Sequence, residues 1–237
     1  MPSSSPFHEQ NLLLAAMSPS AKARIFRRLK LVEMHLGDTI HESGQMIEFV
    51  YFPTDCIISL LSVMHNGASA EISVVGNEGM AGVSVFLGGD STPSRTVVQS
   101  KGFAYRISTS EMKAEFENDS EVRLLMLRFT QALITQMSQT AVCNRHHSID
   151  QQLCRWLLLS LDRLQGNQLN MTQELIAKML GVRREGVTEA ASKLQKLGII
   201  EYHRGHITVL DRPGLEENSC ECYAVVKRET DRLIANY

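Results

Sequence analysis

Residues 172–200 constrain the fold of this chain more than any other segment. Ala177 is followed four residues later by Gly181, and Val187 follows six residues after that. A small residue lets two helices cross closely, glycine supplies a left-handed turn, and a β-branched residue fills the angle between the helices. Thr172 suits the N-cap of the first helix. The segment is therefore predicted to fold as a helix-turn-helix.

Two short strands are predicted directly after this motif. Residues 197–203 and 207–211 are rich in strand-forming side chains, and Arg204-Gly205-His206 suits the turn between them. A hairpin at this place is the wing of a winged helix-turn-helix. That architecture predicts binding to double-stranded DNA, with the second helix in the major groove.

The start of the second helix carries chemistry that can read bases. Arginine pairs in bidentate fashion with guanine, and glutamate accepts a hydrogen bond from cytosine. Contacts to phosphate set the register without reading the sequence. The candidate base-reading residues at this helix start are Arg183, Arg184 and Glu185. The candidate phosphate contacts are Thr172, Lys193, Lys196 and Arg204.

The chain as a whole is not basic. It has 24 Lys and Arg residues against 26 Asp and Glu residues, so any attraction to DNA must come from local groups. No apolar run approaches the ~20 residues that cross a bilayer. The apolar stretch at 12–16 precedes its basic cluster, which is the wrong order for a secretory signal. We therefore expect a cytoplasmic protein with no membrane partner.

Residues 31–108 have a different character. Short apolar runs alternate with turn-forming residues such as Ser43-Gly44 and His65-Asn66-Gly67. Short strands with turns at this spacing predict an all-β roll, barrel or sandwich. The predicted strands cover residues 49–52, 57–64, 71–75, 96–99 and 103–107.

Residues 109–164 contain no glycine or proline, which predicts helices. Asn118-Asp119-Ser120 caps a long helix that is followed by a hinge at 145–148 and a second helix at 150–164. The long helix has two apolar stripes, so it can pack on its own domain with one and on a second copy of the chain with the other. The alternative is a monomer in which both stripes form one broad face towards the core. The first stripe is Val122, Leu125, Phe129, Ala132, Gln136, Gln139 and Cys143, and the second is Leu124, Leu127, Ile134 and Met137.

A β-roll, a long helix and a winged helix-turn-helix in this order resemble the Crp/Fnr family of bacterial transcription regulators. The resemblance covers roughly residues 11–215. It implies a cyclic-nucleotide-binding-type roll, a homodimer joined through residues 120–144, a palindromic DNA site, and RNA polymerase as a protein partner. The matching segments are residues 172–177, Gly181-Val182, Arg184-Glu185, Val187, 197–200, and in the N-terminal half 50–53, 57–61 and 76–82.

The resemblance places Arg184 and Glu185 on the family's base-reading positions. Four residues after the glutamate, where the family has its second base-reading arginine, this chain has Glu189, which is also a candidate base-reading residue. Arg183 replaces the family's small hydroxyl N-cap. The preferred half-site is therefore expected to differ from that of the best-known members.

The family's sensory pocket is matched only in part. Cyclic-nucleotide binders hold the ribose with a Gly-Glu pair and the phosphate with an Arg-Ser or Arg-Ala step. Here residues 82–85 contain no acid, and the arginine of residues 93–96 stands one place late. We expect an unidentified small-molecule effector other than a cyclic nucleotide; Arg95 either binds another anion or is a surface loop residue. The candidate pocket residues are Gly82, Ser84, Ser94, Arg95 and Thr96.

The expected organisation is an α+β fold in five segments, of which the resemblance covers the middle three. Residues 1–10 are a disordered lead, 11–118 a cyclic-nucleotide-binding-like sensor roll, 119–147 the dimerisation helix and hinge, 148–215 the winged helix-turn-helix, and 216–237 a helical tail that packs on the winged domain.

No metal or cofactor is expected. An iron–sulfur sensor needs a knot of N-terminal cysteines, and no cysteine precedes Cys56. His146 and His147, taken as solvated hinge residues, point about 100° apart on a helix and do not easily share a metal. The spacing of Cys220 and Cys222 is a weak metal signal by itself, and reduced thiols are the expected state.

Two other classes of function compete with DNA binding. A ligand-binding regulatory module could use its helix-turn-helix for protein contacts alone, but the wing and Arg183-Arg184 argue against it. An enzyme would need a nucleophile elbow, P-loop, metal triad or dinucleotide fingerprint, and the sequence has none. The glycine-rich residues 76–82 are flanked by strands and suit a β-turn. The sequence therefore favours a DNA-binding regulator that is not an enzyme.

Overall fold

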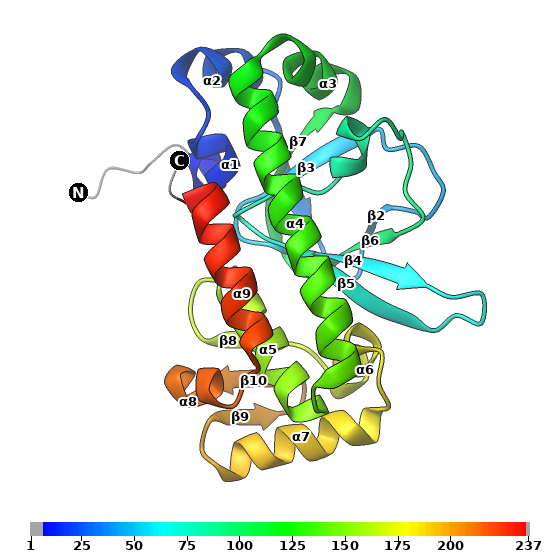
Figure 1. Ribbon diagram of the computed structural model, residues 1–237, viewed down its shortest axis with the longest axis vertical. Coiled ribbons are helices and arrows are strands. Elements are labelled where there is room, and N and C mark those ends of the chain that lie inside the picture. The colour runs from blue at the N-terminus through cyan, green and yellow to red at the C-terminus, as the bar shows by residue number, and fades with distance from the viewer. Residues whose placement is uncertain (1–6, 236–237) are drawn as a thin grey trace.

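The computed structural model describes residues 7–235 and is organised around one long helix, α4 (Ser120–His146) (Figure 1). The strands of the N-terminal half lie along one side of α4, the elements of residues 149–217 gather at its far end, and the helix of residues 221–230 runs back beside it. No helix among the described residues is long and apolar enough to cross a membrane. The order of elements confirms the predicted α+β fold.

The N-terminal roll consists of two antiparallel sheets, ordered β1-β7-β3 and β2-β6-β4-β5. All five predicted strands are present, within two residues at each end. The first two strands were missed because β1 is largely exposed and β2 has only three residues, so neither forms an apolar run. The strands are β1 (Lys30–Met34), β2 (Thr39–His41), β3 (Phe49–Pro53), β4 (Ile57–Val63), β5 (Ser69–Val75), β6 (Arg95–Ser100) and β7 (Gly102–Ser108).

The N-terminal segment differs from its prediction. Phe7–Gln10 form a 3-10 turn, η1, where a disordered lead over residues 1–10 was predicted; residues 1–6 lie outside the described part of the chain. The turn is ordered because the His8 ring packs edge-on against Phe26, with ring centroids 4.1 Å apart. Two short helices follow, α1 (Leu12–Ala15) and α2 (Pro19–Ile25).

Helix α4 begins where the capping residues predicted. The Asp119 carboxylate accepts hydrogen bonds from the backbone N–H groups of Glu121 and Val122, at 3.0 and 3.1 Å. The preceding helix α3 (Thr109–Asn118) begins after Ser108, whose hydroxyl accepts a hydrogen bond from the Glu111 backbone N–H. The first apolar stripe of α4 packs into the chain's own core, with only Gln139 half-buried.

Gln136 explains how a polar residue fits in that buried stripe. Its Oε1 accepts from the Val74 backbone N–H at 2.6 Å and from the Ser73 hydroxyl at 2.9 Å, and its Nε2 donates to the Val74 carbonyl at 3.1 Å. Val74 lies on β5, the edge strand of its sheet. The amide therefore bonds backbone groups on the outer strand that an edge strand otherwise leaves without partners.

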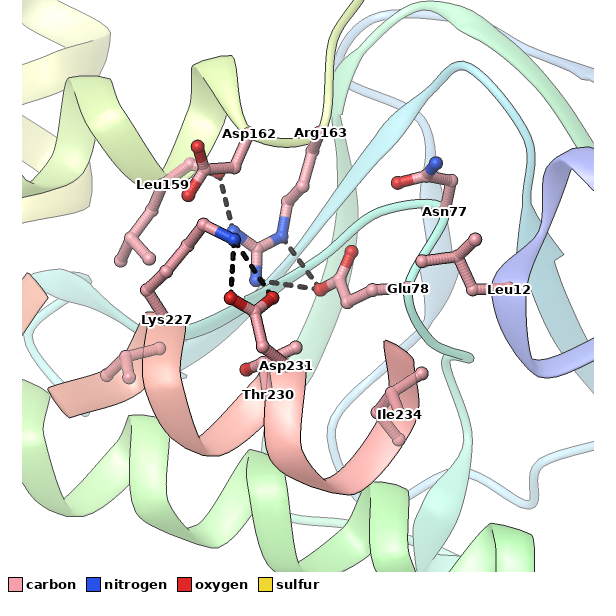
Figure 2. A pocket seen from close by; sticks show the side chains of 11 residues that line it. Leu12, Asn77, Glu78, Leu159, Asp162, Arg163, Lys227, Thr230, Asp231 and Ile234 are labelled. Atoms are coloured by element: carbon pink, nitrogen blue, oxygen red, sulfur yellow. Dashed lines mark hydrogen bonds and ion pairs between the residues drawn. The ribbon is translucent and has the colours of Figure 1, made fainter. Parts of the chain in front are cut away.

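The glycine-rich residues 76–82 form the predicted turn, and the turn is where other elements approach most closely. A Cβ on Gly79 would lie 2.2 Å from the Phe129 ring of α4, and one on Gly76 would lie 2.6 Å from the Arg163 side chain. The Arg163 guanidinium reaches Glu78 in this turn, with Nε–Oε1 at 2.8 Å and both side chains buried (Figure 2). A side chain at position 76 would collide with Arg163, and one at position 79 with Phe129, so both positions require glycine.

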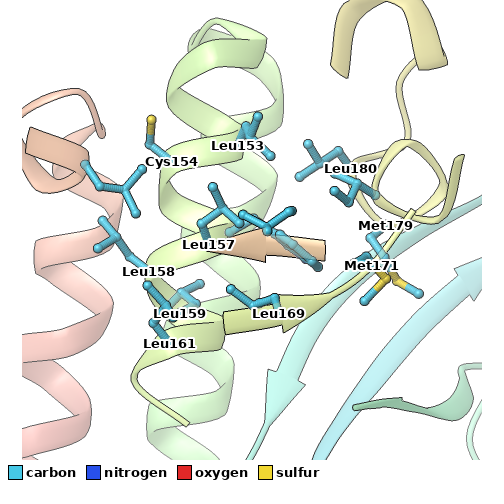
Figure 3. Packing of buried hydrophobic residues seen from close by; sticks show 14 of the residues in the cluster. Leu153, Cys154, Leu157, Leu158, Leu159, Leu161, Leu169, Met171, Met179 and Leu180 are labelled. Atoms are coloured by element: carbon cyan, nitrogen blue, oxygen red, sulfur yellow. The ribbon is translucent and has the colours of Figure 1, made fainter. Parts of the chain in front are cut away.

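The winged domain is built on α5, whose leucines face the rest of its core (Figure 3). The short strand β8 was not predicted, because three residues of alternating polarity give little signal; it pairs with β10 through Leu169 and Ile207. The elements are α5 (Ile149–Leu161), β8 (Gln168–Asn170), α6 (Gln173–Leu180), α7 (Arg184–Lys196), β9 (Ile200–His203) and β10 (His206–Val209).

The C-terminal tail packs on the winged domain, as expected, and also reaches the roll. It forms α8 (Arg212–Glu217), α9 (Glu221–Thr230) and a π-helical turn η3 (Asp231–Ala235), and α9 lies beside α4 (Figure 1). Val226 is buried in the core of the winged domain, while Leu233 is buried with α4 and the roll. The apolar face extends past the winged domain, which is why the tail reaches both.

A buried acid fastens the winged domain to the roll. Glu71 of β5 accepts hydrogen bonds from the Ser59 hydroxyl of β4 and from the indole N–H of Trp156 in α5, the latter at 3.0 Å. Burial raises the pKa of Glu71 to about 7. Since the folded state holds the proton more tightly than the unfolded chain, the acid lowers stability as the pH rises from its unfolded pKa towards 7.

We expect Glu71→Gln to stabilise the protein more at pH 8 than at pH 5, because it removes the cost of a buried carboxylate only where that carboxylate is ionised. The difference in unfolding free energy between the variant and the wild type should be about 2–3 kcal/mol larger at pH 8 than at pH 5. Denaturant titrations of both proteins at the two pH values measure it. An equal effect at both pH values would contradict the assigned pKa.

Candidate nucleic-acid interface

The helix-turn-helix has the geometry that its spacing predicted. The Thr172 hydroxyl accepts from the Leu175 N–H at 3.3 Å and caps α6. Gly181 ends α6 in the left-handed conformation, with φ of 67°. Val187 is fully buried and Ala177 nearly so, which holds α6 and α7 together.

The first turn of α7 presents charged side chains to solvent. Arg183 occupies the N-cap position without a capping side-chain hydrogen bond, so its guanidinium is not committed to the helix end. The opposite side of the turn faces α5, because a Cβ on Gly186 would lie 2.7 Å from Ile149. The candidate base-reading residues Arg183, Arg184, Glu185 and Glu189 are all exposed.

The wing turns back beside this helix start. Arg204 and Gly205, with φ of 48° and 86°, form the tight left-handed turn between β9 and β10. A hollow lies between the wing and the first turns of α6 and α7. Its lining includes Arg184 and Arg204, together with Thr172, Gln173, Glu174, Tyr202 and Gly205. Two arginines around one open hollow suit a phosphate group.

The predicted phosphate-contacting residues differ in whether their side chains already have partners within the protein. Lys193 forms an ion pair with Asp150, with Nζ and Oδ2 2.9 Å apart, so this contact must open before it can meet DNA. The Thr172 hydroxyl already serves as a helix cap. Lys196 and Arg204 are exposed and form no ion pair within residues 7–235.

Two of the candidate effector residues, Gly82 and Thr96, lie beside His41, for which no role was predicted. Gly82 precedes the short turn η2 (Val83–Phe86), and a Cβ there would lie 3.6 Å from the ring of His41. Thr96 is the strand neighbour of His41 on the other side. Burial lowers the pKa of His41, which favours its neutral form.

Arg95 is held by a partner that the sequence reading also missed. Its Nε lies 2.9 Å from Oε2 of Glu42. Any anion bound by Arg95 would have to compete with this carboxylate. An effector site built from Gly82, Ser84, Ser94, Arg95 and Thr96 stays a prediction.

The structure also gathers four residues for which no metal site was predicted. The ligand atoms of Cys143, His147, Cys220 and Cys222 all lie within 4.8 Å of one another. His147 is therefore not the solvated hinge residue that was expected, although His146 is exposed. Cys143 and Cys220 are far apart in the sequence, so only the spacing of Cys220 and Cys222 hinted at this cluster.

Comparison with models of known protein families identifies the C-terminal domain. Residues 151–218 match the family model of the Crp-like helix-turn-helix domain. No curated protein is a significant match.

Solved structures share the fold over most of the chain. A regulator assigned to the Crp/Fnr family from Eubacterium rectale is 18% identical, with a TM-score of 0.69, covering 89% of this chain and 98% of its own. FixK2 of Bradyrhizobium japonicum is 14% identical, with a TM-score of 0.64, covering 81% and 98%. A CRP-family transcriptional regulator of Thermus thermophilus is 16% identical, with a TM-score of 0.66, covering 79% and 96%.

Residues 151–218 therefore form a Crp-like helix-turn-helix domain, of the kind that binds DNA, and the chain as a whole shares its fold with solved regulators of the Crp/Fnr family.

Proposed function

We propose that the protein binds a palindromic DNA site as a homodimer, with α7 of each subunit in the major groove. The observation that carries this proposal is the first turn of α7, where Arg183 and Arg184 are exposed beside Arg204 of the wing. Arg184 and Glu185 read bases, and Lys196 and Arg204 hold the phosphate backbone. Because its ligand is DNA, the protein works in the cytoplasm, and RNA polymerase is its protein partner.

The second stripe of α4 supplies the dimer interface. Three of its residues, Leu124, Leu127 and Ile134, are between 43% and 51% exposed, although all are large apolar residues on one helix; the fourth, Met137, is partly buried against the core of the roll. Leu124, Leu127 and Ile134 follow heptad spacing, which suits a parallel pair of helices. The opposite stripe is already buried in the roll, so pairing would cover the apolar face that the single chain leaves in solvent.

A signal at the roll would act through the spacing of the two recognition helices. Two half-sites on one face of DNA are about one helical turn apart, so the two α7 helices must match that distance. The roll packs against α4, and α4 leads through His147 into α5. An effector that favours one arrangement of the roll therefore favours one spacing.

Arg184→Ala should weaken binding to the selected DNA site by about 1–3 kcal/mol, or roughly 5- to 150-fold, and relax base preference at one position of each half-site. The site would first be obtained by selection from random duplexes. Affinities would then be measured over a salt series on the selected site and on single-base variants.

Two matched variants separate base reading from charge. Lys196→Ala should weaken binding to all duplexes alike and reduce the slope of log affinity against log salt concentration by about one. Arg27 is an exposed arginine of the N-terminal half, and Arg27→Ala should leave binding unchanged. Equal losses for Arg184→Ala and Arg27→Ala would contradict the interface.

Ile134→Glu should convert the dimer to a monomer, because pairing would bury an unpaired charge in the apolar seam. The molar mass from light scattering across a concentration series checks this, with a dissociation constant raised at least about tenfold. Met64→Glu, at an exposed apolar residue of the β4–β5 turn, is the control and should stay dimeric. A wild-type protein that is monomeric at all concentrations would exclude the interface.

A further inference from the structure

The end of α4 and the start of α9 bring three thiols and one imidazole together. Cys143 lies in the last turn of α4 and His147 directly follows that helix, while Cys220 and Cys222 begin α9. The Cys143 and Cys220 Sγ atoms are 3.5 Å apart, and Cys222 Sγ lies 3.6 Å from His147 Nδ1. The three cysteines are buried and the histidine is partly buried.

These separations are those of a tetrahedral zinc site. Zinc binds thiolate at about 2.3 Å and imidazole at about 2.0–2.1 Å, which in a tetrahedron places two sulfurs about 3.8 Å apart and a sulfur and a nitrogen about 3.6 Å apart. The remaining pairs of ligand atoms lie no more than 4.8 Å apart, within reach of small side-chain rotations. We propose that Cys143, His147, Cys220 and Cys222 bind one Zn²⁺ ion as a structural Cys₃His site.

The charges around the cluster fit this ligand. Zn²⁺ with three thiolates and a neutral imidazole carries one negative charge, which a buried site must balance. Arg155 is 4% exposed and acts electrostatically on the Cys143 and Cys222 thiolates. Its Nη1 donates to Thr140, but its buried Nε has no hydrogen-bond partner within residues 7–235. A cation left partly unpaired beside three thiols indicates that an anionic centre completes the site.

A carboxylate orients the histidine ligand. Glu221 Oε2 lies 3.4 Å from Nε2 of His147, while Nδ1 of the same ring faces Cys222. Ligating histidines commonly hold a carboxylate on the ring nitrogen that does not bind the metal. The ring is therefore presented with Nδ1 towards the cluster.

A disulfide explains the cluster less well. The Sγ–Sγ separation of 3.5 Å is well beyond the bonded distance of about 2.05 Å. One disulfide would also leave a third thiol and the imidazole without a role. Zinc uses all four groups, and its binding needs no oxidant, since each thiol only releases its proton to solvent.

The site would tie the tail to the hinge that precedes the winged domain. His147 separates α4 from α5, and the tail residues Cys220 and Cys222 come from beyond the wing. One ion would thus join the end of the proposed dimerisation helix to the chain that follows the DNA-binding motif. The site stands on its own geometry and does not depend on DNA binding.

The test is metal analysis of the full-length protein, purified under reducing conditions. We expect about one zinc per chain by mass spectrometry, and Co²⁺ added to the metal-free protein should give the visible spectrum of a tetrahedral thiolate complex. Cys143→Ser and Cys220→Ser should lose the bound metal, whereas Cys56→Ser and Cys154→Ser, at buried cysteines outside the cluster, should retain it. Circular dichroism checks that each variant is folded.

His147→Ala guards against loss of folding, because this side chain is partly exposed. It should remain folded and bind Co²⁺ at least about tenfold more weakly with an altered spectrum. The proposal is overturned if the reduced protein binds neither Zn²⁺ nor Co²⁺ at one per chain. It is equally overturned if the cluster variants bind as tightly as the controls, if iron takes the place of zinc, or if Cys143 and Cys220 form a disulfide in the purified protein.

Discussion

The whole molecule depends on the burial of one stripe of α4 against the roll. One stripe of this helix supplies Val122, Leu125 and Phe129 to the core of the roll, and the amide of Gln136 bonds the outer strand of a sheet. A polar residue in an apolar stripe would normally weaken the packing of a helix. Here its hydrogen bonds fix the helix in register against β5, since a shift along the helix axis would leave the Val74 backbone groups unpaired. Every element beyond α4 inherits its position from that register.

Buried polar contacts then set the winged domain against the roll. Trp156 of α5 donates to Glu71, and Arg163 in the turn after α5 pairs with Glu78, so α5 and the turn that follows it are held at two points. Buried charges cost solvation free energy, and apolar residues of equal size would often give as much stability. Such contacts do, however, penalise every arrangement in which a partner is lost. They therefore favour one orientation of α7 relative to α4, which is the quantity that the two recognition helices of the proposed dimer would have to control.

The parts that the sequence predicted are those whose causes are local. The offsets of Ala177, Gly181 and Val187 describe steric fits within one motif, and Asp119 caps the helix that begins at the next residue. Strand β8 and the lead-in turn depend instead on partners elsewhere in the chain. The same holds for the site residues. His41, which lies beside Gly82, and Glu42, which pairs with Arg95, gave no pattern of their own, because their roles arise only when distant strands come together.

The tail illustrates this limit most clearly. Its helical period was visible in Tyr223, Val226 and Leu233, yet periodicity states only that one face is buried and not against what. The structure places that face across two cores, so the tail bridges the domains that α4 and the hinge connect by backbone alone. A movement of the winged domain about His147 must therefore also shift or release α9. The two domains are thus connected twice, once through the hinge and once through α9. Both connections together would set the angle at which α7 meets DNA.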